Sequence, residues 1–261
     1  MHRGIRATLP FLISTLFFTI LKSAAAADDA PRLSPAFAGR LAAVACTVGI
    51  SYELDGALLP ATRDDALPDG YEPADLISLA GTGIPQWGPQ QLRSLIIPDA
   101  LTMTQAAHVD GIQLAVSSGY RSHGTQAATY RYWVSVRGPE QADRVSARPG
   151  HSQHQLGTAI DFNFGSLGGF AASPAGIWLW DHAHEFGFVF PYTPAGVARS
   201  GYISEPWHVR WVGRELATLM WEEDYQHSDT LIADDYVALA RDSLRGLAQA
   251  GPAVCATARS A

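Results

Sequence analysis

Two segments of the sequence combine histidine and carboxylate side chains at spacings that suit a metal ion. His154 and Asp161 are seven residues apart, and Gly157 between them permits a sharp turn that would bring both side chains together. Imidazole and carboxylate groups are both good zinc ligands. His208 is a candidate third ligand, which would leave the fourth tetrahedral position open, as in catalytic zinc sites. From spacing alone a metal site and a chance arrangement both remain open.

Glu205 and Arg121 are the candidates for the chemistry itself. Glu205 lies three residues before His208 and could act as general base toward a water molecule. Pro206 argues against a regular strand, so Glu205 is expected in the loop before the strand that carries His208. Arg121 follows a predicted strand, at a position where binding groups often lie. It could hold a substrate carboxylate or stabilise the oxyanion of a tetrahedral intermediate.

The segments that must position these residues mix helical and extended patterns. Periodicity, caps and breakers predict helices over 34–46, 89–109 (with Pro98 breaking or restarting it), 125–136, 177–185, 215–225 and 230–251, the last as one or two helices. Strands are predicted over 112–117, 158–164 and 209–212, and 51–89 is expected to form loops with short strands. The fold class predicted is α+β, with a small antiparallel sheet that carries the site and is flanked by helices.

The first residues are typical of a secretory signal peptide. Arg3 and Arg6 precede an apolar run from Leu9 to Leu21, and small residues follow up to Ala26. As a helix this run spans about 20 Å, short of the roughly 30 Å of a bilayer core. We expect cleavage near Ala26 and export to the periplasm or the extracellular space, with no stable membrane span afterwards. The alternative is an uncleaved segment that tethers the protein to the membrane.

The predicted organisation is a signal peptide (1–26), an N-terminal extension (27–49), a catalytic domain (50–250) and a C-terminal tail (251–261). The chain has 261 residues and a formal net charge of -7, with no basic cluster, so nucleic acid is not an expected partner. Its two cysteines are too few for a four-cysteine zinc site. In an oxidising compartment Cys46 and Cys255 are candidates for a disulfide, and two buried thiols are the alternative.

Three motifs, in this order, resemble the VanY-type D-alanyl-D-alanine carboxypeptidases, a family within the zinc peptidases that include lysostaphin-like enzymes and the hedgehog fold. The motifs are Ser118-Gly119-Tyr120-Arg121-Ser122, then Ser152-x-His154-x-x-Gly157-x-Ala159-x-Asp161, then Glu205-Pro206-Trp207-His208. The likeness covers roughly residues 50–225. One departure is Gln153, which stands where an acidic residue is common, but it is not a proposed ligand.

The resemblance implies one zinc ion per chain, held by His154, Asp161 and His208, with Glu205 as general base. It also implies a substrate subsite near Arg121, lined by Ser118, Tyr120, Gln126 and Ser152. The implied partners are peptidoglycan stem peptides, and the first interpretation is removal of the terminal D-alanine from a pentapeptide. The alternatives are L,D-carboxypeptidase action on tetrapeptide stems and, in another class, a wall-binding module that keeps the zinc fold without catalysis.

Overall fold

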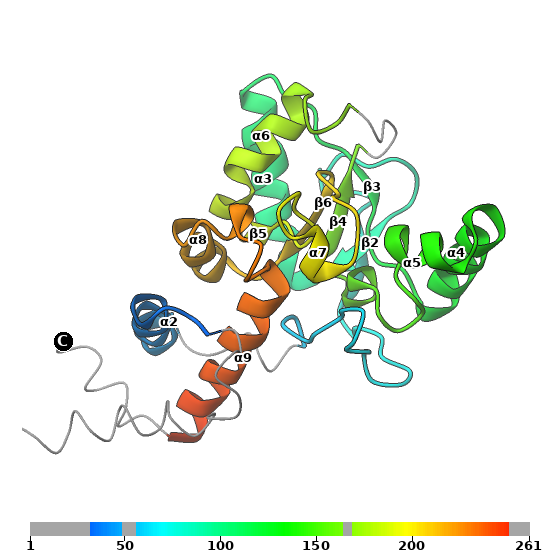
Figure 1. The fold of residues 1–261 in the computed structure, drawn as a ribbon. Helices are drawn as coiled ribbons and strands as arrows, with labels where there is room; N and C mark the ends of the chain where they lie inside the picture. Colours follow the sequence, from blue (N-terminus) through cyan, green and yellow to red (C-terminus); the bar gives the residue numbers. More distant parts are fainter. Residues whose placement is uncertain (1–31, 49–55, 164–168, 251–261) are drawn as a thin grey trace, which may run out of the picture. The chain divides into compact units, whose positions relative to one another are not determined.

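A computed structural model of the chain describes residues 32–48, 56–163 and 169–250 (Figure 1). The predicted signal segment and the predicted tail, with Cys255, lie outside these residues. The described residues from Leu33 onward belong to one compact unit. The predicted domain boundaries therefore stay predictions.

Helices and very short strands are mixed along the described chain. The α-helices are α2 (Pro35–Val48), α3 (Ile97–Val109), α4 (His123–Arg137), α5 (Pro139–Val145), α6 (Pro174–His182), α7 (Val197–Ser200), α8 (Arg214–Glu222) and α9 (Ala233–Ala250). The strands are β1 (Leu76–Ser78), β2 (Gln91–Arg93), β3 (Val116–Ser118), β4 (Ala159–Phe162), β5 (Phe188–Val189) and β6 (His208–Trp211). Single turns of 3-10 helix are η1 (Ser94–Ile96), η2 (Gln153–Leu156), η3 (Ala183–Phe186) and η4 (Tyr225–His227).

The strands form two small antiparallel sheets. β3, β4, β6 and β5 lie side by side in that order, and β1 pairs with β2. Helices α3 and α6 lie on one side of the larger sheet, while α4 and α5 extend from its β3 edge (Figure 1). The α+β prediction, with a small antiparallel sheet flanked by helices, is confirmed.

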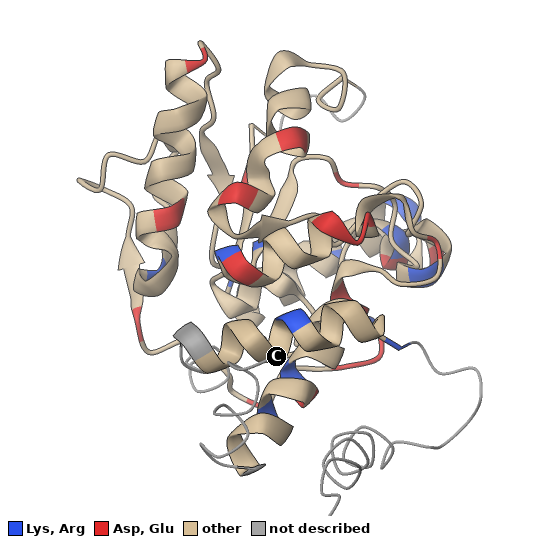
Figure 2. Ribbon diagram, turned by 90° about the vertical axis from the view of Figure 1, so that its left-hand side faces the viewer, with Lys and Arg blue, Asp and Glu red and all other residues tan. Residues whose placement is uncertain are grey.

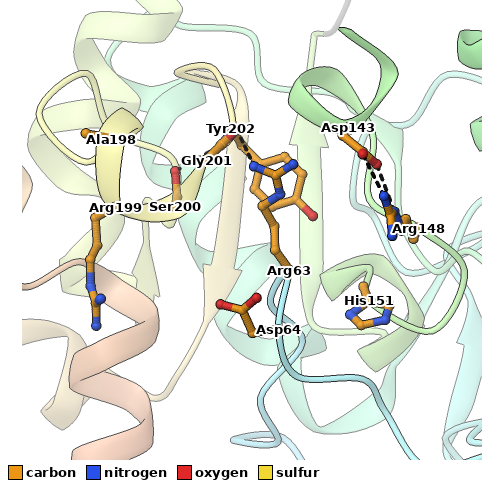
Figure 3. Close-up of a pocket in the computed structure, with 10 residues that line it drawn as sticks. All are labelled: Arg63, Asp64, Asp143, Arg148, His151, Ala198, Arg199, Ser200, Gly201 and Tyr202. Atoms are coloured by element: carbon orange, nitrogen blue, oxygen red, sulfur yellow. Dashed lines mark hydrogen bonds and ion pairs between the residues drawn. The ribbon is translucent and has the colours of Figure 1, made fainter. Parts of the chain in front are cut away.

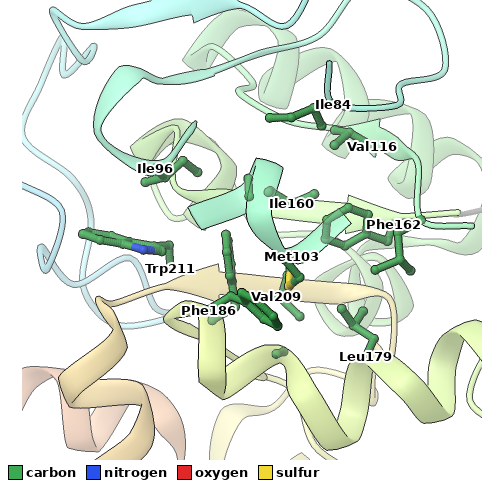
Figure 4. Close-up of a cluster of buried hydrophobic side chains, with 14 of the residues drawn as sticks. Ile84, Ile96, Met103, Val116, Ile160, Phe162, Leu179, Phe186, Val209 and Trp211 are labelled. Atoms are coloured by element: carbon green, nitrogen blue, oxygen red, sulfur yellow. The ribbon is translucent and has the colours of Figure 1, made fainter. Parts of the chain in front are cut away.

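The two faces of the larger sheet have different chemistry because side chains alternate along a strand. Ile160 and Phe162 of β4 and Val209 and Trp211 of β6 point into the main hydrophobic core. Figure 4 shows these side chains around Met103 of α3, which is fully buried. The residues between them in the sequence therefore face the opposite side, where the candidate site lies.

A second core joins the two ends of the described chain. α2, α8 and α9 pack together, with Phe37 of α2 lying 5.3 Å from the ring of Tyr236 of α9. Tyr225 anchors this core to the sheet, because its hydroxyl accepts the backbone N–H of Phe190 at 2.7 Å. The predicted C-terminal helix is thus one continuous helix, α9, which starts at Ala233.

The predicted helix over 89–109 is wrong at its beginning. Residues 91–93 form β2, which pairs with β1 before the chain turns through η1 into α3. Pro98 lies in the first turn of α3, where its missing N–H costs nothing, so the helix restarts there. The strand predicted over 112–117 is shorter in the structure and lies further along the chain, as β3 (Val116–Ser118). It starts late because the Ile112 N–H donates to the Ala107 carbonyl at the end of α3.

Acidic and basic positions are both spread over several helices of the described chain (Figure 2). Among the described residues, no helix combines the length and the apolar character needed to cross a membrane.

Candidate active site

Three adjacent strands present polar side chains in a row across the open face of the larger sheet. Asp161 of β4 stands directly opposite Ser118 of β3 on one side and opposite His208 of β6 on the other. Residues opposite each other in an antiparallel pair have side chains about 5 Å apart. The register of the sheet therefore brings two of the three predicted ligands together.

His154 reaches the same point from outside the sheet. It lies in η2, and Gly157 ends that turn in the left-handed conformation with φ 71°. A β-carbon at Gly157 would lie 2.9 Å from Cγ of Arg93 and 3.0 Å from Cδ2 of Leu76. Both the backbone angle and this close approach require glycine. The turn that the sequence predicts between His154 and Asp161 is confirmed.

The three predicted ligands converge on one point. Asp161 Oδ2 lies 3.3 Å from His154 Nε2, and Asp161 Oδ1 lies 2.9 Å from His208 Nδ1. One ligand atom from each residue lies within 4.8 Å of the other two, and all three side chains are buried. This spread suits three ligands of one metal ion.

The outward-facing nitrogens of both imidazoles have fixed hydrogen-bond partners. His154 Nδ1 donates to the Gly119 carbonyl at 2.7 Å, which leaves Nε2 facing the site. His208 Nε2 lies 3.1 Å from Oε1 of Gln153. Such partners orient ligand imidazoles and fix which nitrogen is free.

The orientation of the Gln153 amide follows from a carboxylate behind it. Gln153 Nε2 donates to both oxygens of Asp234, at 2.9 and 3.1 Å, and Asp234 also accepts from Arg210 at 3.1 Å. Burial raises the pKa of Asp234 to about 6 and Arg210 opposes the rise, so this side chain is an acceptor at neutral pH. The amide oxygen must then face His208, whose Nε2 carries the hydrogen and whose Nδ1 is free.

The site therefore fits a metal cation by the chemistry of its donor set. With the other nitrogens of His154 and His208 donating outward, the atoms that face one another are two imidazole lone pairs and the oxygens of Asp161. Acceptors that meet in a buried place need a positive charge between them, which a metal ion or a proton on an imidazole can supply. Two nitrogen ligands and one oxygen ligand are a set that zinc accepts.

The protonation states of the candidate ligands depend on one another. Burial alone would raise the pKa of Asp161, but the neighbouring His154 and His208 lower it well below its usual range. Burial lowers the pKa of His208, although Asp161 acts in the opposite direction. An ionised Asp161 beside a neutral His208 is the state that binds a metal.

Glu205 lies in the loop before β6, as expected. Its carboxylate oxygen Oε2 is 3.9 Å from His208 Nδ1, so it faces the same point as the ligands. Its backbone is fixed by hydrogen bonds to Tyr192 and His208. Burial raises the pKa of Glu205 to about 8, Asp161 adds to the rise, and Arg121 opposes it.

Arg121 points to the site from the loop between β3 and α4. Its guanidinium donates to Gln126 Oε1 at 2.9 Å and to Ser118 Oγ at 3.0 Å, and lies 3.9 Å from Asp161 Oδ2. Its backbone N–H donates to the His154 carbonyl at 3.1 Å. Two side chains predicted to line the substrate subsite, Ser118 and Gln126, thus hold Arg121 in place.

The remaining predicted subsite residues flank this arrangement. Ser152 is buried directly before η2, and Tyr120 is half-buried next to Arg121. Their contact with a substrate stays a prediction. The sequence reasoning missed Asp234 and Arg210. The period of the strand could have placed Arg210 on the same face as His208, but nothing in the sequence indicates that Asp234 is its partner.

A family comparison agrees with this geometry. The sequence model of the VanY family, D-alanyl-D-alanine carboxypeptidase, matches residues 89–214, which include the three candidate ligands, Glu205 and Arg121. The solved structure of the LdcB LD-carboxypeptidase is 31% identical, with a TM-score of 0.57, and the match covers 65% of this chain and 83% of that one. The chain belongs to the VanY family.

Two further similar proteins of known activity are a curated relative and a solved structure. A D-alanyl-D-alanine carboxypeptidase of Enterococcus faecalis is 29% identical over 180 residues, 66% of this chain and 64% of that protein. A vancomycin-resistance D,D-pentapeptidase VanY, solved in complex with Zn(II), is 28% identical with a TM-score of 0.55, and the match covers 64% of this chain and 93% of that one. The chain spans about six tenths of the length of two curated relatives that it matches.

Proposed function

We propose that this protein is an exported, zinc-dependent carboxypeptidase that removes the terminal D-alanine from peptidoglycan stem peptides. The observation that carries the proposal is the convergence of His154, Asp161 and His208 on one point that Glu205 and Arg121 also face. Membership of the VanY family supports the activity, and the Zn(II) complex of the related D,D-pentapeptidase supports the metal.

His154 Nε2, Asp161 and His208 Nδ1 would hold one zinc ion per chain. A zinc ion bound there would supply Lewis acidity toward a peptide carbonyl and toward a water molecule. The chain's own contribution is a rigid set of ligands, because each imidazole is oriented by an acceptor behind it.

Glu205 would move the proton. As general base it takes a proton from the attacking water, and as general acid it returns that proton to the leaving amine of D-alanine. Its pKa of about 8 without a cation would fall beside a divalent ion, because a nearby positive charge favours the carboxylate. Glu205 can then accept a proton at neutral pH.

Arg121 would orient the substrate. Its guanidinium is held by Gln126 and Ser118 in a fixed direction, close to the carboxylate of Asp161. A fixed guanidinium binds a carboxylate through two parallel hydrogen bonds, which would select the free C-terminus of a peptide. Stabilisation of the oxyanion is the other role that its position allows.

L,D-carboxypeptidase action on tetrapeptide stems is the second candidate. The observation that favours it is the likeness to the LdcB LD-carboxypeptidase, at 31% identity. Both candidates use the same ligands and the same base, so the difference lies in which peptide the subsite accepts.

The test is incubation of purified protein and zinc with synthetic pentapeptide and tetrapeptide stems, with the products identified by mass spectrometry. We expect loss of one alanine from the pentapeptide, abolished by a chelator. The Glu205→Ala variant should keep one zinc per chain and lose at least about 10²-fold in turnover, the usual contribution of a general base. Cleavage of the tetrapeptide alone would establish L,D action. Zinc binding without cleavage of either peptide would contradict the enzyme and favour a wall-binding module.

A further inference from the structure

A cavity of about 380 Å³ opens beside the candidate active site (Figure 3). Three segments line it: the loop with Arg63 and Asp64, the chain from Asp143 through Arg148 to His151, and α7 with the residues that follow it up to Tyr202. Figure 3 shows Arg63 and Asp64 in the middle, between the side chains of Arg199 and Arg148. Nothing in the proposed reaction uses this cavity.

The loop that carries Arg63 and Asp64 is held in place. Its Thr62 carbonyl accepts a hydrogen bond from His151 Nδ1 at 2.8 Å, and the Thr62 hydroxyl accepts the Asp64 N–H at 3.2 Å. Arg63 donates to the Gly201 carbonyl at 3.3 Å, and its guanidinium lies 5.6 Å from the ring of Tyr202. Both charged groups are therefore presented from a fixed backbone.

The charges around the cavity divide into those held in a close ion pair and those that are not. Arg148 donates twice to Asp143, at 2.7 and 2.9 Å, and Arg199 donates twice to Asp235, at 2.6 and 3.1 Å. Within the described residues, Arg63 and Asp64 form no close ion pair, although Arg63 acts electrostatically on Asp143 and Asp64 on Arg199. The cavity thus offers a cation and an anion on adjacent residues, neither of them held in a close ion pair.

The cavity shares a wall with the metal ligands. The ring of Tyr202 lies 5.0 Å from that of Tyr192, which in turn lies 5.1 Å from that of His208. His151, on the other side, comes three residues before His154. A peptide extends by about 3.3–3.6 Å per residue, so a long side chain one residue before the one that donates the scissile carbonyl can reach the cavity.

We propose that Arg63 and Asp64 form a specificity subsite for a side chain that ends in a zwitterionic amino-acid group, a carboxylate and an ammonium on one carbon. Arg63 binds the carboxylate and Asp64 binds the ammonium. In a stem peptide this is a diamino-dicarboxylic acid as third residue. The inference rests on the proposed function and deepens it, because it names the substrate class that the same site accepts.

The neutral groups of the cavity agree with such a ligand. The hydroxyl of Tyr202 projects beside Arg63 toward His151 in Figure 3. Burial raises the pKa of Tyr202 well above its usual range, so this hydroxyl remains a hydrogen-bond donor beside the guanidinium. A lysine side chain brings only an ammonium and would leave Arg63 without a partner, which makes lysine the poorer ligand.

The test uses four pentapeptide stems that differ only in the side chain of residue three. In the four peptides this side chain ends, respectively, in a carboxylate and an ammonium (diaminopimelate), in an ammonium alone (lysine), in a carboxylate alone (2-aminopimelate) and in a methyl group (norleucine). Their Kd values are measured by calorimetry on zinc-loaded Glu205→Gln protein, alone and combined with Arg63→Ala or Asp64→Ala. Arg137→Ala, an exposed arginine of α4 that packs on Trp133, is the matched control. The kcat/KM of the corresponding proteins with Glu205 intact is measured in parallel.

We expect the zwitterionic peptide to bind at least about tenfold more tightly than the other three, the size of one charge-assisted hydrogen bond. Arg63→Ala should abolish the gain in Kd that the side-chain carboxylate gives, and Asp64→Ala should abolish the gain that the ammonium gives. The norleucine peptide should bind to all variants with the same Kd. Equal Kd values for the four peptides, or a loss that is the same for all four, would overturn the subsite. No cleavage of any peptide would contradict the proposed function, whereas the calorimetry would still decide the subsite.

Discussion

The geometry of the three candidate metal ligands depends on residues outside that set. His208 can offer Nδ1 because Gln153 accepts the hydrogen of Nε2, and Gln153 points that way because Asp234 accepts from its amide. Arg210 fixes Asp234 in turn, and also donates to the Leu59 carbonyl at 2.7 Å. A change at any of these positions should act on the metal through the orientation of one ring.

Gln153→Met tests this chain of hydrogen bonds, since it removes both amide contacts and leaves the ion pair between Arg210 and Asp234 in place. We expect zinc affinity to fall about 10- to 100-fold, the usual effect of losing a partner of a ligand imidazole. Competition with a chromophoric chelator measures it. Gln155→Met, a buried glutamine in the same turn that donates to the Tyr71 carbonyl, is the control. Equal affinities in the two variants would contradict the role of Gln153.

At the residue scale, the sequence indicated which side chains gather at the candidate site and missed the residues behind them. Spacing and the family resemblance proposed His154, Asp161 and His208 as ligands, and the structure brings these three side chains together. Gln153 stood out only as a departure from the family pattern. Its partner Asp234 lies 81 positions further along the chain, and no local pattern links two residues so far apart.

Among the elements, the single turn η2, which ends at Gly157, carries one of the three candidate ligands. It joins His154 in η2 to Asp161 in β4, and a β-carbon there would meet Arg93 and Leu76. Gly157→Ala should lower the free energy of unfolding by about 1–3 kcal/mol, through the left-handed backbone and the close contacts, and should weaken zinc binding as well. Urea unfolding and metal titration measure the two effects.

Gly246→Ala is the matched control for that substitution. Gly246 lies inside α9, and a β-carbon there would have nothing within 4 Å. Alanine in a helix interior is favoured over glycine, so this variant should be more stable by about 0.5–1 kcal/mol and bind zinc as before. A loss of stability in both variants would argue against the specific role of the turn.

A carboxylate joins helices α4 and α5 and makes the stability of the protein depend on pH. Asp143 of α5 accepts from Arg148 and from the Tyr130 hydroxyl of α4. The hydrogen bonds from Arg148, and then from Tyr130, lower the pKa of Asp143 to about 2 against the effect of burial. Unfolding restores a pKa near 3.9. The contribution to stability is thus complete above about pH 4 and is lost as the pH falls through about 2.

Asp143→Asn should therefore lower the free energy of unfolding at pH 7 by about 1 kcal/mol, and its difference from the unmodified protein should close between pH 4 and pH 2. Urea unfolding across that range measures the difference. Asp69→Asn, at an exposed carboxylate, should show little effect at any pH. A difference for Asp143→Asn that stays constant down to pH 2 would contradict the assignment.

The sequence predicted most helices and strands to within a few residues. The prediction was wrong where pairing with a distant strand determines the secondary structure. The segment around Leu92 has helical periodicity, yet it forms β2 because β1 supplies a pairing partner 15 positions earlier, at Ile77. Pairing of this kind depends on the whole fold, and local propensity does not contain it.

For the molecule as a whole, the helices at the two ends of the described chain form one structural unit. α2 and α9 pack on each other outside the segment that matches the family model, and Cys46 is buried in α2. Its predicted partner, Cys255, lies beyond the described residues.

If the two cysteines pair, denatured and unreduced protein should contain no titratable thiol, and reduction should expose two per chain. Reduction should also lower the free energy of unfolding by about 2–4 kcal/mol, because the bridge restrains a long loop of the unfolded chain. Thiol titration in denaturant and thermal unfolding with and without reductant measure these effects. Two titratable thiols before reduction would contradict the disulfide.

The position of Asp234 on the last described helix also sets an order of assembly. A chain leaves the ribosome, or crosses a membrane, with its N-terminal part first. The three ligands would emerge well before α9, but the ring of His208 obtains its final support only when Asp234 docks behind Gln153. If the site holds zinc as proposed, tight binding would belong to the finished protein, and a chain cut short before α9 would compete poorly for the metal.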